Sequence, residues 1–412
     1  MIRYTSLAVF LLGAVALVLP LGYFVGPALL VAGSVLLPIL RSGSALSRQE
    51  WAIIGTLLFY AGVSILGFWL DRQSPALVES SIYVFLAIPS LLLLLAFPPS
   101  AAAMWIGMAL GSLLTGGWAS WQTLIDGKRR ASGFGSVDAI QFGDLSLLLG
   151  FFCLAGLGWA LSRSTRSGRL AWCILLVIGA ASGILGSFLS GSRGGWLCFP
   201  FMLGVLYLGY GQHLSRRWLM GLAIFFLVGP VAAYAIPHLG VQERVQRIFS
   251  SYAEFAEKGD ATNSVGARLE MWRSALILIP ERPLLGWGES DYLQARDELI
   301  EKGTIHPYLE KFDHVHNDVL DGWLKRGIGG LASLLALYLV PLFLFARRLR
   351  SPDIRLRAFA IAGAALPVAY MGFGVTQTFL AFDSGIVMYV SWLTVLWSVL
   401  RARERRCKSN DV

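Results

Sequence analysis

Long blocks of apolar residues constrain this chain more than any other feature. Each block runs for roughly 17–22 residues, enough for a helix to cross a hydrocarbon core of about 30 Å. The composition agrees, since 56% of the 412 residues are hydrophobic and 14% are charged, whereas a soluble domain carries about 25% charged residues. Soluble enzymes, secreted disulfide scaffolds and disordered chains are thereby excluded. A β-barrel is excluded because its strands would alternate in polarity over about 10 residues.

We therefore expect an all-α polytopic membrane protein with about twelve transmembrane helices, forming a single integral membrane domain over residues 1–412. The expected spans are residues 5–20, 22–40, 51–70, 81–97, 100–118, 144–162, 169–189, 195–211, 217–236, 328–346, 355–373 and 383–400. The spans themselves carry no Asp, Glu, Lys, Arg or His near their middle, which argues against an ion-coupled transporter.

The placement of Lys and Arg predicts the orientation. The termini and the loops after every second span hold 18 basic and four acidic residues, while the opposite side holds 16 basic and 21 acidic residues. Because basic residues favour the cytoplasmic side, both termini are expected to be cytoplasmic. The net charge of +9 then reflects topology and contact with anionic membrane lipids, and no nucleic-acid partner is expected.

The longest segment between spans, residues 237–327, is expected to be a periplasmic loop that carries interfacial helices. Its patterns predict helices at 241–257, at 265–279 behind Asn263 or Ser264 as cap, and at 289–302. Loops longer than about 15 residues usually carry function. The outer side of the membrane has no ATP or nucleotide sugars, so an enzyme there needs a substrate that arrives already activated, for instance on a lipid carrier.

The first candidate functional residue is Arg193, in the run SGSRGGW at 190–196, where the eighth span begins. It is the only charged residue between Arg169 and Arg216. The glycines allow close approach of a ligand, and the free N–H groups at a helix start favour an anion. The run therefore indicates either an anion site or a snorkelling arginine at a helix end.

The second candidate is Arg268, in the helix expected at 265–279. At 100° per residue it shares a face with Trp272, Ala275 and Ile279. An arginine on the apolar face of an interfacial helix is costly without a partner. The partner is either a bound anion or a carboxylate from the loop.

The third candidate is the run DHVHNDVLD at 313–321, just before the tenth span, which holds two of the five His residues of the chain. Neutral His314 or His316 suits a general base near pH 7. A His-x-His pair with nearby Asp is also a metal-ligand pattern. The remaining interpretation is a helix cap at Asn317 or Asp318 with both His residues on the surface.

One base and two fixed cations suit the displacement of a phosphate leaving group by a hydroxyl, because guanidinium binds phosphate oxygens bidentately. At these residues the chain resembles the O-antigen ligase family, within the group that includes O-antigen polymerases and protein O-oligosaccharyltransferases. The matching pieces are Ser192-Arg193-Gly194, Arg268-x-x-x-Trp272 with PLLGWG at 283–288, and His314-x-His316-Asn317 running into GIGG at 327–330. Their order and the long outer loop agree as well.

The resemblance implies a GT-C-like glycosyltransferase of a bacterial inner membrane, with a periplasmic active site. The donor would be an undecaprenyl-pyrophosphate-linked glycan, and the acceptor a sugar hydroxyl of the lipid A–core oligosaccharide. Transfer would invert the anomeric centre and need no metal and no cofactor. His316 would be the base, since it directly precedes the Asn of the motif, and His314 would assist or orient it. Arg193 and Arg268 would bind the donor pyrophosphate.

Lys128, Arg129 and Arg130 form a basic patch on the outer side, between the fifth and sixth spans. The patch could contact phosphates on the acceptor lipid, or it could be a solvated loop. Other functions remain open. An O-antigen polymerase or a protein O-oligosaccharyltransferase would share the donor, whereas a solute transporter or flippase and a non-catalytic assembly scaffold belong to different classes.

Overall fold

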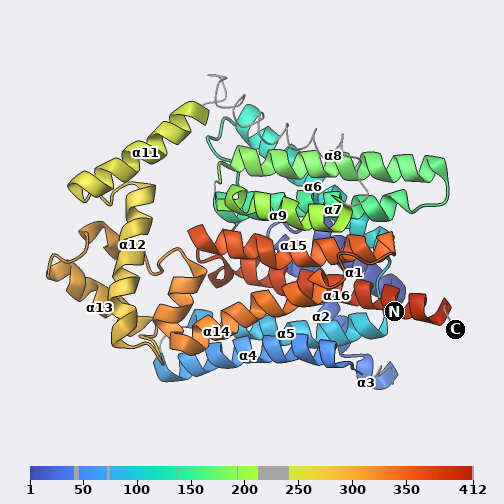
Figure 1. The fold of residues 1–412 in the computed structure, drawn as a ribbon, viewed down its shortest axis with the longest axis horizontal. Helices are drawn as coiled ribbons and strands as arrows, with labels where there is room; N and C mark the ends of the chain where they lie inside the picture. The colour runs from blue at the N-terminus through green and yellow to red at the C-terminus, as the bar shows by residue number, and fades with distance from the viewer. Residues whose placement is uncertain (41–45, 72–74, 136, 193, 212–240, 411–412) are drawn as a thin grey trace.

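The computed structural model describes residues 1–40, 46–71, 75–135, 137–192, 194–211 and 241–410. These residues form helices joined by loops and turns, and none of them lies in a strand, which confirms the all-α prediction (Figure 1). Arg193 and the predicted span 217–236 lie outside the described residues.

The helices follow the predicted spans closely. They are α1 (Ile2–Ala14), α2 (Gly22–Ser34), α3 (Leu37–Leu40), α4 (Arg48–Asp71), α5 (Pro75–Ala96), α6 (Ala101–Leu124), α7 (Ala139–Leu161), α8 (Arg166–Ser190), α9 (Gly194–Tyr210), α11 (Val241–Lys258), α12 (Ser264–Leu278), α13 (Ser290–Glu301), α14 (Asp318–Ala346), α15 (Ile354–Thr376) and α16 (Asp383–Asn410). Short 3₁₀ turns occur at Ile279–Glu281, Pro307–Lys311 and Phe379–Ala381. Within the described part, nine helical segments are long and apolar enough to cross a membrane, and α1 and α9 are shorter apolar helices.

The first predicted span, 5–20, is too long at its C-terminal end. Helix α1 stops at Ala14, and the chain turns before α2 starts behind Leu21, whose φ is 53°. A Cβ on Gly22 would lie 2.1 Å from the carbonyl oxygen of Val15, so only glycine fits this tight connection. Hydropathy cannot detect such a turn, because the turn residues are themselves apolar.

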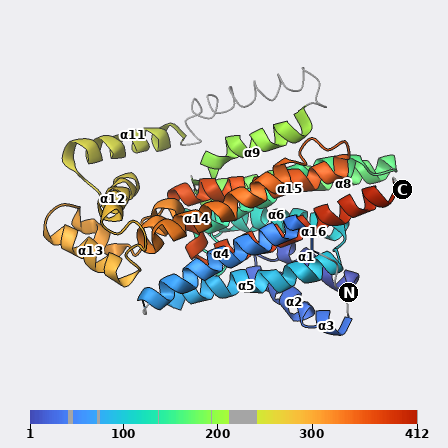
Figure 2. The same cartoon turned by 60° about the horizontal axis from the view of Figure 1, so that its bottom comes forward.

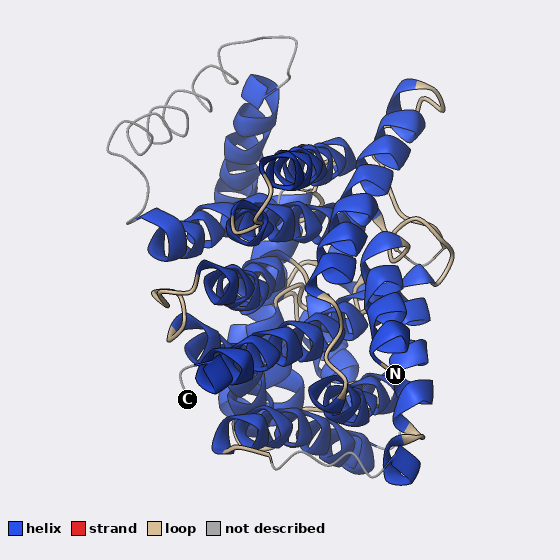
Figure 3. Cartoon of the chain, turned by 90° about the vertical axis from the view of Figure 1, so that its right-hand side faces the viewer, coloured by secondary structure: helices blue, strands red, loops and turns tan. Residues whose placement is uncertain are grey.

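The long helices form one bundle, and the helices α12 and α13 lie beyond one of its ends (Figure 1). Both chain termini lie at the other end. Figure 2 shows the same separation after a turn of 60°, and Figure 3 views the bundle from the end that carries the termini. Helices α7, α15 and α16 are the most deeply buried of the candidate membrane spans. The buried share of the residues in their apolar stretches is 83%, 78% and 89%, respectively.

Helix α14 begins ten residues before the predicted start at 328 and is interrupted near that point. Gly327 has φ 60° and ψ −157°, which breaks the helix. The turn at 283–288 fits into the break, because Trp287 N and Gly288 N donate to the carbonyls of Leu324 and Lys325 at 2.9 Å. A Cβ on Gly327 would lie 2.1 Å from Leu284 O. The glycine-containing runs 283–288 and 327–330 thus pack directly against each other.

The helices expected in the long outer segment are present as α11, α12 and α13. Asn263 caps α12, since its Oδ1 accepts from Val265 N at 3.1 Å and Gly266 N at 2.8 Å. Met271, Tyr292 and other residues of α12 and α13 form a small apolar core that includes Leu324 of α14. This core fixes the outer segment against the end of the bundle.

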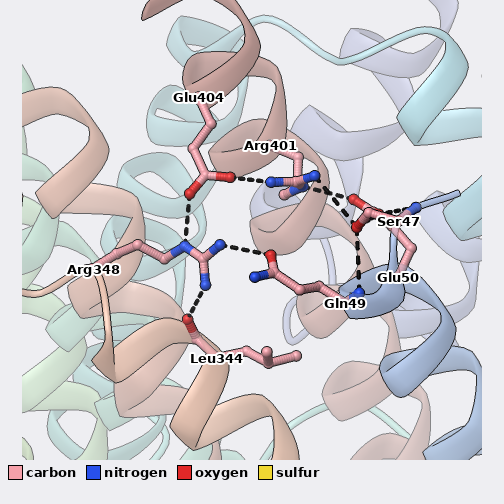
Figure 4. A network of polar contacts seen from close by, with 7 residues as sticks. All are labelled: Ser47, Gln49, Glu50, Leu344, Arg348, Arg401 and Glu404. Carbon is pink, nitrogen blue, oxygen red and sulfur yellow. Dashed lines mark hydrogen bonds and ion pairs between the residues drawn. The ribbon is translucent and has the colours of Figure 1, made fainter. Parts of the chain in front are cut away.

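A polar network joins three helices at the end of the bundle that carries the termini (Figure 4). Arg401 on α16 pairs with Glu50 on α4 at 2.6 Å and also with Glu404. Arg348, directly after α14, pairs with Glu404 at 2.7 Å and donates to Gln49 Oε1 at 2.6 Å. The network ties α14 to α4 and α16 far from the outer segment.

Candidate functional site

The C-terminal end of α15 is the point at which the segments selected from the sequence meet. Arg268 Nε on α12 donates to the carbonyl of Thr376 at 2.9 Å. Asn317 Nδ2, next to His316, donates to the carbonyl of Val375 at 3.3 Å. The last carbonyls of a helix have no partner within it, so they are available to bind other segments. Helix α15 thereby holds α12 and the histidine loop side by side.

Arg268 is half-buried and is oriented by backbone atoms. Its Nη1 donates to Ser264 O at 3.1 Å, in addition to the bond from Nε to Thr376. Arg273, five residues further along the helix, is exposed and pairs with Glu270 at 3.4 Å. The two arginines of α12 therefore have different surroundings, as their positions on the helix predict.

The residues on either side of Arg193 are held by a buried carboxylate. Asp144 Oδ1 on α7 accepts from Ser192 Oγ at 2.7 Å and from Gly195 N at 3.0 Å. Gly194 packs against the end of α15, because a Cβ there would lie 2.1 Å from Thr376 Oγ1. The flanks of Arg193 thus reach the same helix end as Arg268. Asp144 was not among the residues selected from the sequence.

The residues of the basic patch differ in their contacts. Arg130 Nε donates to Ser190 O at 2.8 Å and so covers the C-terminal end of α8, beside the turn that leads to Arg193. Lys128 is exposed and pairs with Asp126 at 3.5 Å. Arg129 is exposed. The patch therefore adjoins the site through Arg130.

His316 adopts an unusual backbone conformation directly before α14. Its φ of 49° lies in the left-handed region, which side chains other than Gly, Asn and Asp rarely adopt. Asn317 forms the cap of α14, with its Oδ1 accepting from Val319 N and Leu320 N at 3.0 Å each. The capping role proposed for Asn317 is therefore confirmed, and the cap fixes the position from which His316 projects. Strain of this kind is common at functional sites.

The two histidine rings lie edge to face with centroids 5.0 Å apart. Burial, His314 and Arg268 together lower the pKa of His316 to about 4, although its contact with Gln377 acts in the opposite direction. Burial also lowers the pKa of His314, against the effect of the Asp321 carboxylate. Both rings are therefore neutral at pH 7. Among the described residues, no hydrogen-bond partner reaches His316 Nδ1.

A buried lysine fixes the loop that carries the histidines. Lys325 Nζ donates to Glu289 Oε1 at 2.9 Å and to Asp313 O at 2.8 Å, and it pairs with Asp321 at 3.3 Å. The sequence offered a signal for part of this group, since Asp321 and Lys325 have the i, i+4 spacing of a helical ion pair. The span expected from 328 leaves both residues outside the helix, so their helical spacing does not stand out in the sequence.

The described residues include no group of three or more His, Cys, Asp or Glu side chains placed to share a metal ion. The arrangement instead joins a neutral imidazole to a fixed guanidinium at one helix end. Such a pair can accept a proton from a hydroxyl and stabilise negative charge on a leaving group.

Comparison with known proteins gives two findings. Residues 175–335 match the family described as O-antigen ligase. The match runs from α8 into α14 and so contains the segments of Arg193, Arg268 and His316. A protein of Haemophilus influenzae whose function is uncharacterized is 26% identical over 377 residues, which cover 91% of this chain and 93% of that protein.

Proposed function

We propose that the chain, whose residues 175–335 match the O-antigen ligase family, belongs to that family and transfers a glycan from undecaprenyl pyrophosphate to a sugar hydroxyl of lipid A–core. The reaction would take place at the periplasmic face of a bacterial inner membrane, with both termini in the cytoplasm. It would complete lipopolysaccharide.

The observation that supports the proposal most is the meeting of Arg268, the flanks of Arg193 and the His316 loop at the end of α15. Arg268 and Asn317 bind neighbouring carbonyls there, those of Thr376 and Val375. These segments are distant in sequence, and each carries a group that the displacement needs.

In the proposed mechanism, His316 accepts the proton of the acceptor hydroxyl as the oxygen attacks the anomeric carbon. The new bond joins that oxygen to the carbon, and the bond from the carbon to the pyrophosphate oxygen breaks. A single displacement places the new bond opposite the leaving group, so the anomeric configuration inverts. Arg193 and Arg268 stabilise the charge that develops on the pyrophosphate. The mechanism uses no metal and no cofactor.

His314 is proposed to orient His316, because the rings are in edge-to-face contact and His314 adjoins the Lys325 group. Lys128, Arg129 and Arg130 are proposed to contact phosphates of the acceptor lipid. Arg130 would do so from a position fixed by its bond to Ser190. Membrane lipids would surround the bundle.

The test uses purified protein in detergent with a chelator, undecaprenyl-pyrophosphate glycan and lipid A–core. Product size is read on a gel for the wild type, His316→Asn, Arg268→Gln and, as a control on the same helix, Arg273→Gln. We expect a shifted ladder with the wild type and Arg273→Gln only. Full transfer by His316→Asn would contradict its role as base.

The same assay separates ligation from polymerisation. If no protein forms product with lipid A–core, but the wild type elongates when lipid-linked repeats are the only substrate, the protein is a polymerase and the proposed acceptor is wrong.

A further inference from the structure

A cavity of about 270 Å³ lies beside the histidine pair. Helices α4, α5 and α14 and residues 378–382 contribute to its lining, and His314 is one of the lining residues. His314 in turn contacts the His316 ring, which is the proposed base. The cavity is therefore one side chain away from the reaction centre.

An unpartnered polar atom marks the cavity as a binding site. Thr378 lines it and is only 4% exposed, yet no described residue forms a hydrogen bond with its Oγ1. Gln377, the preceding residue, instead contacts His316 and is not part of the lining. Buried polar groups are nearly always bonded, so the Thr378 hydroxyl indicates that a polar ligand occupies the cavity.

The charges that line the cavity indicate which ligand is acceptable. Four acidic side chains and two cations line the cavity, so a negative excess remains even when the buried Asp318 is neutral. The carboxylates are Glu289, Asp313, Asp318 and Asp321, and the cations are Lys325 and Arg326.

Both cations have partners within the protein. Lys325 Nζ is engaged by Glu289, Asp321 and the Asp313 carbonyl, and Arg326 Nη1 donates to Ser64 Oγ at 2.9 Å. Carboxylate oxygens accept several hydrogen bonds each and can receive hydroxyl donors. The same negative excess repels a phosphate.

We propose that this cavity, the acceptor cavity, binds one uncharged sugar residue, the residue whose hydroxyl attacks the donor, and rejects a phosphorylated sugar at that position. Its volume lies just below the range of about 300–1,000 Å³ typical of small-molecule pockets, so it suits one sugar unit. The proposal rests on the proposed function for its choice of acceptor. It adds that the pyrophosphate and the acceptor sugar are sorted by charge, with arginine on one side of His316 and carboxylates on the other.

The first test removes the unpartnered hydroxyl. Thr378→Val keeps the shape of the side chain, Thr378→Ser restores the hydroxyl, and Thr394→Val on α16 is the matched control, since Thr394 Oγ1 is bonded to Ser391 O at 2.9 Å. We expect Thr378→Val to raise the acceptor KM by about 3- to 10-fold, the effect of one lost hydrogen bond. The donor KM should not change, and Thr378→Ser should recover the wild-type value. An unchanged acceptor KM, or a raised donor KM, would overturn the proposal.

The second test measures charge selectivity without turnover. Binding of core oligosaccharide, with its terminal sugar phosphorylated or dephosphorylated, is measured by calorimetry in the absence of donor. The wild type should prefer the dephosphorylated form, and Asp313→Asn should reduce that preference by about tenfold, because it removes one negative charge from the lining. Asp313 is exposed, so this variant is expected to fold.

Equal binding of both forms by the wild type would refute the acceptor cavity. Because this measurement needs no transfer, it also separates the two proposals. Failure of transfer with selective binding intact would count against the proposed function alone, and transfer with unselective binding would count against the acceptor cavity alone.

Discussion

Lowering the pH tests the role of His316 most directly. Burial, His314 and Arg268 lower its pKa from the ordinary 6.5 to about 4. At 1.36 kcal/mol per pKa unit, the imidazolium is disfavoured by about 3 kcal/mol relative to solvent. A base must be neutral, so the acid limb of kcat/KM, which reports the free enzyme, should lie well below pH 6. Bound pyrophosphate would favour the imidazolium, so the acid limb of kcat should lie at higher pH.

The assay is initial-rate transfer between pH 4 and 8, with the concentrations of donor and acceptor varied separately. Arg268→Gln removes one of the three causes that lower the pKa, so its acid limb in kcat/KM should move to higher pH. Arg273→Gln, exposed on the same helix, should leave the limb in place. An acid limb of kcat/KM at pH 6.5 in the wild type would show that the His316 environment is not as described.

The free energy of unfolding should also depend on the titration of His316. Between pH 6.5 and 4 the unfolded state binds a proton at His316 that the folded state does not, so the free energy of unfolding should rise with pH across this window. In His316→Asn this part of the pH dependence should vanish. Asn is the appropriate replacement, since it tolerates the φ of 49° better than Ala. Identical pH dependence of the melting temperature in both proteins would refute the reasoning.

Three further substitutions test parts of the fold that support the site. Asp144→Ala removes the oxygen that accepts both hydrogen bonds from the turn at 192–195, so we expect a higher donor KM with an unchanged acceptor KM in the transfer assay. Gly327→Ala forces a side chain to φ 60° and should destabilise by at least about 1–3 kcal/mol, whereas Gly329→Ala, with its nearest neighbour 3.7 Å away, should melt like the wild type. Arg401→Met leaves the buried Glu50 without its cation and should lower stability by about 3–5 kcal/mol in detergent melts, without changing either KM.

The apolar blocks predicted the helices well, because the cost of exposing a backbone in lipid determines where helices must be. The apolar blocks do not predict the start of α14, which begins ten residues before the expected span. Its first turns carry Asp318, Asp321 and Lys325, which a hydropathy pattern treats as water-exposed. In the structure all three are buried, and Lys325 pairs with Asp321 at 3.3 Å. A hydropathy pattern treats each residue separately, so it does not detect opposite charges that pair with each other inside the protein.

The sequence also offers Arg268 and the His316 run as candidates, since unusual charges and histidines stand out in an apolar chain, and the structure brings both to the end of α15. It missed Asp144, although an acidic residue in a membrane helix is a functional signal. The expected span starts at 144, which places this carboxylate at the end of the span instead of inside it. Helix α7 begins at Ala139 instead, and Asp144 is wholly buried within it. An error of five residues in a helix boundary concealed the residue that holds the turn around Arg193.

No sequence motif could reveal that the C-terminal end of α15 holds the parts of the site together. Arg268 and Asn317 are held by the carbonyls of Thr376 and Val375, which are backbone atoms and carry no sequence signature. Any residue at those two positions would offer the same acceptors, so the arrangement depends on where α15 ends and not on which side chains end it. The negative end of a helix also suits a guanidinium. The residues that follow, Gln377 and Thr378, carry side chains that adjoin His316 and the acceptor cavity respectively, so the end of α15 also positions side chains at the proposed site.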